Sequence, residues 1–256
     1  DLDGTLLDHQ TYSFAPAQKS LQFLNKNNIP VIFCSSKTRK ELLYWKDQLN
    51  NTHPFISENG GGIFIPKSYF SFSFEHTDHD ESSYIIRFGA SFSQLQKTMQ
   101  ELEDQFDVIS FLTMPTKTIE KYTGLSKKMA QLASEREYDI PFLINDPTQI
   151  DDIIQYIHQH HLHITKGGRF YHLIGENDKG KAVNMLTRLY HQHYSTVESI
   201  GIGDSENDFS MLKQVNKPYL VKKTNGSYAS SNFSHAQGIG PEGWHEIIEK
   251  EYQHNS

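Results

Sequence analysis

The chain has 256 residues, of which 36% are hydrophobic and 21% charged, a composition typical of globular proteins. No apolar run approaches the roughly 20 residues that span a bilayer, and the start lacks a basic and apolar signal segment. The formal net charge of −7 argues against nucleic acid and anionic membranes as partners. The one cysteine, Cys34, cannot form an internal disulfide, and we expect a cytoplasmic protein.

The first part of the chain alternates predicted helices and strands. Pro16 begins an apolar-periodic helix, residues 30–34 (PVIFC) predict a buried strand, a helix covers 42–49, and 55–57 predict another strand. This alternation favours a parallel sheet with helices on both faces. Because a buried strand normally precedes such a unit, we expect apolar residues upstream of Asp1.

The middle part follows a different pattern. The polar, unperiodic stretch 75–83 (EHTDHDESS) is interpreted as a linker, and apolar residues from Leu95 to Phe106 recur at helical spacing. Strands surround this helix and others at 84–88, 108–112, 141–144, 162–165 and 169–174. We interpret the middle part as a separate α+β unit inserted into the first domain.

The core pattern resumes in the last part of the chain. A helix is predicted at 181–190, strands at 199–203 and 219–221, and a last helix at 242–250. The predicted fold is therefore α/β, with a Rossmann-like parallel-sheet core and an inserted α+β cap. The predicted boundaries are 1–82 and 177–256 for the core and 83–176 for the cap.

The segment Asp1-Leu2-Asp3-Gly4-Thr5 carries the strongest chemical signal. Two carboxylates two residues apart at a strand end point into one crevice, where open α/β sheets bind ligands. One carboxylate can attack phosphorus while the other donates a proton to the leaving oxygen. Gly4 lets the backbone turn close to the site. The competing interpretation is a solvated acidic turn.

A second acidic segment follows the strand at 199–203. Asp204 and Asp208 are four residues apart and can share one helical face. Oxygen-rich sites of this kind suit Mg²⁺, which keeps several waters and the substrate phosphate as ligands. The alternative is a helix start, since Asp, Ser and Asn are good N-caps.

Two further residues are candidates for binding phosphate. Ser35 follows an apolar strand, so its hydroxyl and a backbone amide can bind a transferring phosphate; the alternative is a capping serine. Lys179 can neutralise phosphate oxygens and the attacking carboxylate, and its alternative is a solvated surface lysine.

Together these segments resemble the haloacid dehalogenase superfamily of phosphotransferases. The resemblance implies that Asp1 becomes a phosphoaspartate and that Asp3 acts as general acid and then base. It implies phosphate binding by Ser35 and Lys179, and a cap between the second and third motifs, the superfamily's second cap type. It also implies Mg²⁺ bound by the Asp1 side chain, the Asp3 carbonyl and Asp204, with Asp208 in support.

Other blocks resemble one family, the mannosyl-3-phosphoglycerate phosphatases. They include 36–39 (SKTR), 55–66 (FISENGGGIFIP), 123–126 (TGLS), 136–142 (REYDIPF), 167–170 (GGRF) and 240–244 (GPEGW). This chain has Ile140 where the family usually has an acidic residue. The resemblance implies hydrolysis of mannosyl-3-phosphoglycerate to the compatible solute mannosylglycerate. Candidate substrate-binding residues are Ser36, Lys37, Asn59, Gly60, Arg136, Gly167, Gly168 and Arg169.

Several alternatives remain open at this stage. The substrate can be another small phosphorylated molecule, such as a sugar phosphate or glucosyl-3-phosphoglycerate, and the protein can instead be a phosphomutase or a non-catalytic sugar-phosphate sensor. Arg136 and Arg169 suit the substrate carboxylate, because arginine binds carboxylates in bidentate geometry; the alternative is that Arg136 pairs with Asp139. The histidines at 158–163 are not interpreted as a zinc site, because they lack ordered ligand spacing. The oligomeric state is not predicted.

Overall fold

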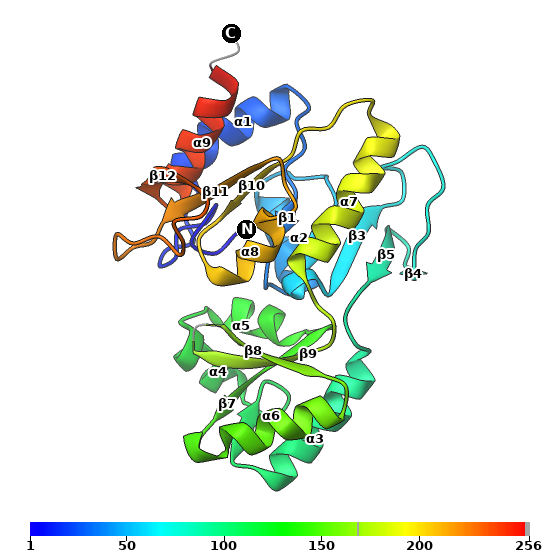
Figure 1. The fold of residues 1–256 in the computed structure, drawn as a ribbon, viewed down its shortest axis with the longest axis vertical. Helices are drawn as coiled ribbons and strands as arrows, with labels where there is room; N and C mark the ends of the chain where they lie inside the picture. The colour runs from blue at the N-terminus through cyan, green and yellow to red at the C-terminus, as the bar shows by residue number, and fades with distance from the viewer. Residues whose placement is uncertain (168, 254–256) are drawn as a thin grey trace.

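The computed structural model describes residues 1–167 and 169–253. It consists of two bodies, one above the other in Figure 1. We call residues 1–87 and 177–253 the core and residues 90–174 the cap. The chain therefore leaves the core once, builds the cap and returns, as expected of an inserted domain.

The core contains two sheets. In the larger sheet, β1 and β2 are parallel while β3, β5 and β4 are added antiparallel, and all strands of the smaller sheet are parallel. The larger sheet has the order β1 (Phe33–Cys34), β2 (Phe55–Ser57), β3 (Gly62–Pro66), β5 (Ser83–Arg87) and β4 (Asp78–His79). The smaller sheet has the order β10 (Ile200–Gly203), β11 (Lys217–Lys222) and β12 (Ser234–Ile239).

Helices cover both faces of these sheets. One apolar cluster joins the sheets to α1, α2 and α9 through Leu24, Leu42 and Trp244, and another joins them to α7 and α8 through Leu186 and Leu212. The core helices are α1 (Gln18–Lys26), α2 (Arg39–Gln48), α7 (Lys179–His193), α8 (Phe209–Leu212) and α9 (Pro241–Gln253), with 3-10 turns η1 (Ala15–Ala17), η2 (Glu58–Gly60) and η4 (Glu206–Asp208). This three-layer arrangement leaves the carboxyl ends of the strands free for a site.

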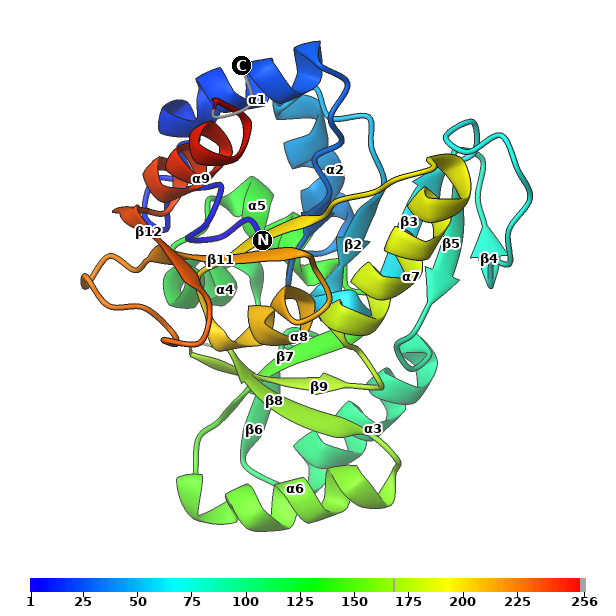
Figure 2. The same ribbon diagram turned by 45° about the horizontal axis from the view of Figure 1, so that its top comes forward.

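The cap is a four-stranded antiparallel sheet with helices. Ile140, Phe142 and Leu173 pack against α3 and α6, which lie on the side of the sheet turned away from the core (Figure 2). The strand order is β6 (Val108–Ser110), β7 (Asp139–Ile144), β9 (Phe170–Ile174) and β8 (His163–Gly167). The helices are α3 (Phe92–Gln105), α4 (Thr116–Thr123), α5 (Lys127–Ser134) and α6 (Ile150–Gln159), with the turn η3 (Pro147–Gln149). On the opposite face, α4 and α5 pack against Ile109 of β6 and Leu143 of β7, while residues of β8 and β9 line a cleft shared with the core.

The predicted fold class is confirmed, but one boundary needs correction. β5 pairs with β3 along its whole length, so the strand at 84–88 belongs to the core sheet, and the chain first crosses to the cap after it rather than at residue 83. The supposed linker at 75–83 contains β4, which pairs with β5. Backbone pairing at a sheet edge tolerates this polar sequence, so the composition alone did not reveal a strand.

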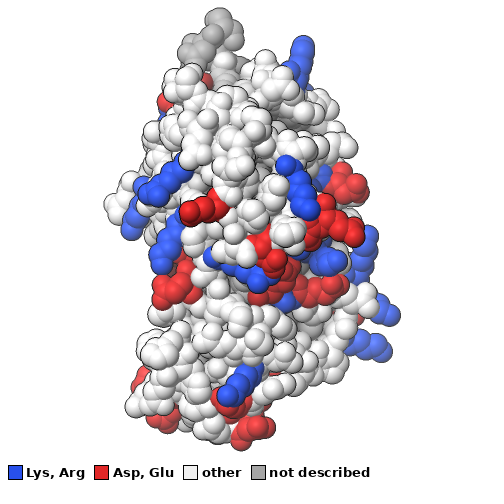
Figure 3. All heavy atoms as spheres, turned by 90° about the vertical axis from the view of Figure 1, so that its right-hand side faces the viewer, with Lys and Arg blue, Asp and Glu red and all other residues white. Residues whose placement is uncertain are grey.

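The surface shows mixed charge. Acidic and basic side chains gather together across the middle of the face in Figure 3, so neither sign dominates there. Some acidic and basic side chains of the core form ion pairs, as Arg39 does with Asp80 and Arg87 with Asp78. Among the helices that the structure describes, none has the length and apolar content needed to cross a membrane.

Candidate active site

The opening acidic segment lies beside the end of β10. The Asp1 nitrogen donates to the Ile202 carbonyl at 2.8 Å, which fixes the segment against the smaller sheet. Gly4 turns the chain with φ +73°, and a Cβ atom there would lie 2.8 Å from Asp204 Oδ2. Both features favour glycine at this position, because an L side chain would be strained and would strike Asp204. The turn thus brings the first and second acidic segments together.

Lys179 connects the acidic residues at the floor of the site. It is the first residue of α7, whose N-cap Asp178 accepts from the Lys181 amide at 2.9 Å. Its Nζ donates to Asp1 Oδ1 at 3.0 Å and to Asp208 Oδ1 at 2.7 Å, and its side chain is 1% exposed. Burial opposes the lysine charge, but the neighbouring carboxylates, Asp208 first, outweigh it and raise the pKa of Lys179. We call Asp1, Lys179 and Asp208 the floor cluster.

The acidic groups fit a divalent cation. Carboxylate oxygens of Asp1, Asp204 and Asp208 lie within 4.8 Å of one another. Asp208 is committed to the protein, since its Oδ1 accepts from Lys179 and its Oδ2 from the Asp204 and Ser205 amides at 3.0 and 3.2 Å. Burial and the charge of Asp208 raise the pKa of Asp204. Three carboxylates and one lysine leave two negative charges for a cation to neutralise, and oxygen-only donors suit Mg²⁺.

The loop after β1 presents a second lysine. Lys37 Nζ lies 2.9 Å from Asp3 Oδ1 and 3.5 Å from Glu41 Oε1. Glu41 also forms a capping box with Thr38 at the start of α2, which fixes how the loop enters this helix. Burial opposes the lysine charge, but Asp3 and Glu41 outweigh it and raise the pKa of Lys37. Lys37 is therefore a cation beside the carboxylate expected to move the proton.

The two serines of this loop differ in position. Ser35 is wholly buried, and its hydroxyl accepts from the Lys37 amide at 3.3 Å. Ser36 lines the cleft between core and cap, which has a volume of about 770 Å³. Asp1, Asp3, Asn59, Lys179 and Asp204 also line this cleft. The structure therefore brings most of the expected catalytic and metal-binding residues to one place.

The glycines after β2 serve close packing. A Cβ atom at Gly60 would lie 2.3 Å from the Asp178 carbonyl, and one at Gly61 would lie 2.3 Å from the Tyr138 Cβ. A Cβ atom at Gly62 would lie 2.6 Å from the Tyr138 ring. Gly60 thus lets η2 approach the backbone that holds Lys179, and the next two glycines receive a cap side chain. Gly60 does not itself line the cleft.

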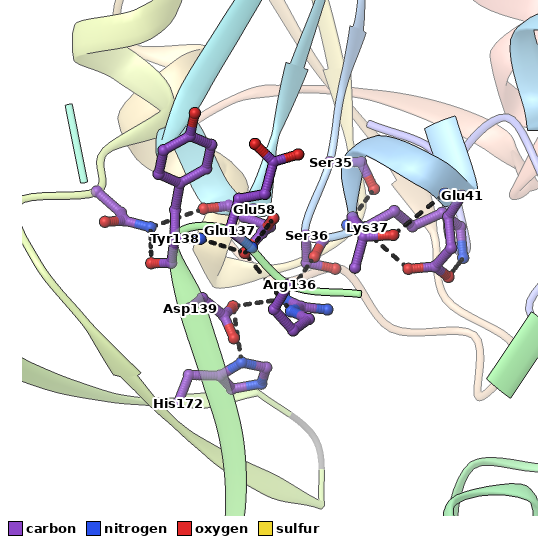
Figure 4. Close-up of polar contacts among 12 residues, drawn as sticks. Ser35, Ser36, Lys37, Glu41, Glu58, Arg136, Glu137, Tyr138, Asp139 and His172 are labelled. Carbon is purple, nitrogen blue, oxygen red and sulfur yellow. Dashed lines mark hydrogen bonds and ion pairs between the residues drawn. The ribbon is translucent and has the colours of Figure 1, made fainter. Parts of the chain in front are cut away.

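Arg136 has partners other than those expected. Its side chain is 7% exposed, and its Nη2 donates to Asp139 Oδ2 at 2.7 Å and to the Ser36 carbonyl at 3.0 Å. Its Nε lies 3.6 Å from Glu58 Oε2 (Figure 4). Arg136 does not line the cleft, so in this structure it joins the cap to the core instead of facing a substrate carboxylate. The alternative pairing with Asp139 is the one observed.

Glu58 completes this junction. It is wholly buried, and its carboxylate accepts from the Glu137 and Tyr138 amides at 2.8–3.1 Å. Burial raises the pKa of Glu58 to about 8, although Arg136 acts against that shift. On the cap side, His172 Nδ1 lies 3.0 Å from Asp139 Oδ2. The junction cluster consists of Glu58, Arg136, Asp139 and His172.

The remaining cap candidates lie elsewhere. Arg169 is exposed, donates to the Tyr122 carbonyl at 2.6 Å and does not line the cleft. Gly167 pairs with Phe170 in the hairpin of β8 and β9, and Gly168 lies outside the described residues. Ile140 is wholly buried in the cluster with α3 and α6. The departure at Ile140 therefore affects packing inside the cap, away from the cleft.

Several cleft residues were not expected from the sequence. Thr165, Lys166, His172 and Ile174 line the cleft from the cap, and Lys222, Lys223 and His9 from the core. Alternation along the strand at 169–174 placed His172 on the face opposite Leu173, which was a usable signal. The missing information was which sheet face meets the core.

Comparison with known sequences gives consistent matches. A family model described as haloacid dehalogenase-like hydrolase matches residues 1–229. A Methanococcoides burtonii protein named glucosyl-3-phosphoglycerate/mannosyl-3-phosphoglycerate phosphatase is 44% identical, with 97% of this chain and 94% of that protein covered. A Pyrococcus furiosus protein named mannosyl-3-phosphoglycerate phosphatase is 36% identical, with 86% of this chain and 88% of that protein covered. The expected phosphatase family agrees with these names.

Solved structures share the fold. A haloacid dehalogenase-like hydrolase from Bacteroides thetaiotaomicron superimposes with a TM-score of 0.70 at 15% identity, covering 98% of this chain and 97% of that one. Thermoplasma acidophilum 0175 gives a TM-score of 0.68 at 22% identity, covering 99% and 96%. Core and cap are thus both part of the likeness.

Proposed function

Since the chain belongs to the haloacid dehalogenase-like hydrolases, we propose that it hydrolyses the phosphate monoester of mannosyl-3-phosphoglycerate and of glucosyl-3-phosphoglycerate. The products are the glycosylglycerate and inorganic phosphate. The substrate proposal rests on the name of the 44%-identical relative, which covers both sugars. The chemical proposal rests on the floor cluster, where Lys179 bonds to Asp1, which lines the cleft, and to the buried Asp208.

In the proposed first step, an Asp1 carboxylate oxygen attacks phosphorus and the bond from phosphorus to the glyceryl oxygen breaks. Asp3 gives its proton to that oxygen, so the leaving group departs neutral at this position. In the second step Asp3 takes a proton from a water molecule, which attacks the phosphorus and releases phosphate from Asp1. Lys179 and the Thr5 hydroxyl, which donates to Asp1 Oδ2 at 3.1 Å, orient the nucleophile.

Mg²⁺ is the proposed cofactor. Asp1 and Asp204 would hold it through their carboxylates and Asp3 through its backbone carbonyl, and the ion would supply positive charge against the phosphoryl oxygens. Asp208 would support the site indirectly, through Lys179 and the Asp204 amide. The two uncompensated negative charges described above support this proposal.

The remaining binding roles are proposals of the same kind. Ser36 and Asn59 line the cleft and would meet the phosphoryl or glyceryl oxygens, with Ser35 fixing the loop beneath them. Lys37 would move between Asp3 and the substrate anion. Arg169 would reach the substrate carboxylate only after leaving the Tyr122 carbonyl. Arg136 acts through its neighbours in the junction cluster.

The test is phosphate release from a panel of phosphomonoesters by the magnesium-loaded protein. The panel holds mannosyl- and glucosyl-3-phosphoglycerate, 3-phosphoglycerate, common sugar phosphates and para-nitrophenyl phosphate. We expect the highest kcat/KM values for the two glycosyl-3-phosphoglycerates. Higher values for a plain sugar phosphate would overturn the substrate proposal, and binding without release of phosphate from any ester would indicate a sensor. A phosphorylated rearrangement product would indicate a phosphomutase.

A further inference from the structure

One cap residue in the cleft has a fixed orientation. His172 lies on β9, and its side chain is 14% exposed, so it is mostly packed yet reachable. Its Nδ1 lies 3.0 Å from Asp139 Oδ2 on the neighbouring strand (Figure 4). Among the described residues, no partner is found for its other ring nitrogen, Nε2.

The cap sheet places this histidine on the core side. β7 and β9 are antiparallel with Pro141 opposite His172, so Asp139 is the diagonal neighbour of His172 on the same face. Leu173 points to the other face, into the apolar cluster with α3 and α6. Strand alternation therefore directs the imidazole to the cleft.

Asp139 determines which ring nitrogen is free. It is wholly buried and accepts from Arg136 at 2.7 Å. Burial opposes its charge, but Arg136 and His172 outweigh burial and lower the pKa of Asp139. An ionised carboxylate only accepts hydrogen bonds, so Nδ1 of His172 must carry the hydrogen that Asp139 accepts. The nitrogen left for a ligand is Nε2.

Arg136 connects this pair to the phosphoryl side of the cleft. The guanidinium that holds Asp139 also donates to the carbonyl of Ser36, in the loop next to Asp3 and Lys37. Glu58, which lies against the same guanidinium, receives two backbone amides at the start of β7. The imidazole is thus held at a fixed place relative to the loop that would bind the phosphoryl group.

We propose that His172 is a specificity-determining residue, whose Nε2 forms a hydrogen bond with an oxygen of the substrate's organic part beyond the phosphate. This inference rests on the proposed function, because it takes the substrate to carry a carboxylate and sugar hydroxyls there. Asp139 and Arg136 are positioning residues that fix the ring. The core residues bind the phosphoryl group, and His172 distinguishes substrates by the organic group attached to the phosphate.

The variant His172→Asn tests this proposal. The asparagine amide nitrogen comes close to the place of Nδ1 and can still donate to Asp139, while Nε2 is lost. We expect kcat/KM for glucosyl-3-phosphoglycerate to fall at least about tenfold, mainly through KM. Para-nitrophenyl phosphate has neither a carboxylate nor sugar hydroxyls, so its kcat/KM should change less than about twofold. His172→Gln, whose longer amide reaches the Nε2 position, should recover part of the loss.

A matched control is His163→Asn. His163 is also a strand histidine bonded to a carboxylate, Glu176 at 2.9 Å, but it is exposed and does not line the cleft. This variant should leave both kcat/KM values unchanged. Asp139→Asn should reproduce the loss on glucosyl-3-phosphoglycerate more weakly, with kcat for para-nitrophenyl phosphate retained, which a general loss of structure would not give.

Two further substrates identify the oxygen that His172 binds. A tenfold effect of His172→Asn on 3-phosphoglycerate, which has the carboxylate but no sugar, indicates the carboxylate; an effect confined to the glycosylated ester indicates a sugar hydroxyl. Equal effects on all esters, or no effect on any, would overturn the proposal. If the wild-type protein releases no phosphate from glycosyl-3-phosphoglycerates, the proposed function fails, and the same ratio measured on the best substrate of the panel still decides the role of His172.

Discussion

The floor cluster and the junction cluster each bury a cationic side chain between acidic ones, yet the two clusters have different roles. Lys179 is held between two carboxylates of the core, Asp1 in the opening turn and Asp208 in η4, and Asp1 opens onto the cleft. Arg136 is held between a core carboxylate and a cap carboxylate, and its third partner is a backbone carbonyl. In our proposal the first cluster presents the nucleophile, whereas the contacts of the second join one domain to the other. A buried cation near a cleft is thus not by itself a substrate-binding group.

The largest effect should come from Asp1→Asn. The amide cannot attack phosphorus, so kcat for every phosphomonoester should fall at least about a thousandfold. The measurement is steady-state phosphate release, with Asp104→Asn on the exposed face of α3 as control. Wild-type turnover in a purified Asp1→Asn protein would remove Asp1 from the mechanism, and the floor cluster would be structural like the junction cluster.

Lys179→Met should have the largest effect on stability. It leaves two buried carboxylates without their partner, which costs about 3–5 kcal/mol of unfolding free energy. Lys181→Met is the matched control two residues along α7, because Lys181 pairs with Glu176 on the surface and should change stability by less than about 1 kcal/mol. Denaturant unfolding of both variants gives the comparison. Equal losses would mean that burial of the floor cluster does not matter energetically.

Asp204→Ala should change the need for metal. It removes one of two carboxylates left free for a cation, so the magnesium concentration for half-maximal activity should rise at least about tenfold. Asp104→Ala serves as the control. Phosphate release at increasing magnesium is the measurement, and full activity of the wild-type protein in excess chelator would contradict a metal at this site.

A smaller, pH-dependent effect should come from the junction cluster. Burial raises the pKa of Glu58 to about 8 from an ordinary 4.5. The folded protein then binds more protons than the unfolded chain between these values, so Glu58 makes the unfolding free energy fall as pH rises through that window. The advantage of the wild-type protein over Glu58→Gln should therefore shrink by at least about 1 kcal/mol between pH 5 and pH 8. A constant difference would show that Glu58 is ionised throughout.

The two clusters also differ in how far the sequence predicts them. Asp1, Asp3 and Asp204 lie in two short acidic segments, the second directly after β10, and these segments could be recognised from the local sequence and their order along the chain. Arg136 and His172 meet through the register of β7 and β9 and through contact between two domains. A sequence pattern does not specify either of these, and the same holds for the placement of Arg169.

The helices and strands of the fold likewise differ in how far the sequence predicts them. Buried apolar strands such as β2 and β10 and amphipathic helices such as α3 were predicted from periodicity. β12 and β4 were missed because these edge strands are largely polar and are defined by their pairing with a neighbouring strand. The sequence analysis treated Gly60 only as a candidate substrate-binding residue, and the packing of Gly60, Gly61 and Gly62 against Asp178 and Tyr138 became known only from the structure.

The most direct test of the account is to trap the intermediate on Asp1. The protein is quenched in acid during turnover of glucosyl-3-phosphoglycerate and reduced with borohydride, which converts an aspartyl phosphate to homoserine, and its peptides are analysed by mass spectrometry. The account predicts homoserine at position 1, with Asp3 and Asp204 unchanged. Homoserine at either of those two positions, or none in a protein that is releasing phosphate, would contradict nucleophilic attack by Asp1.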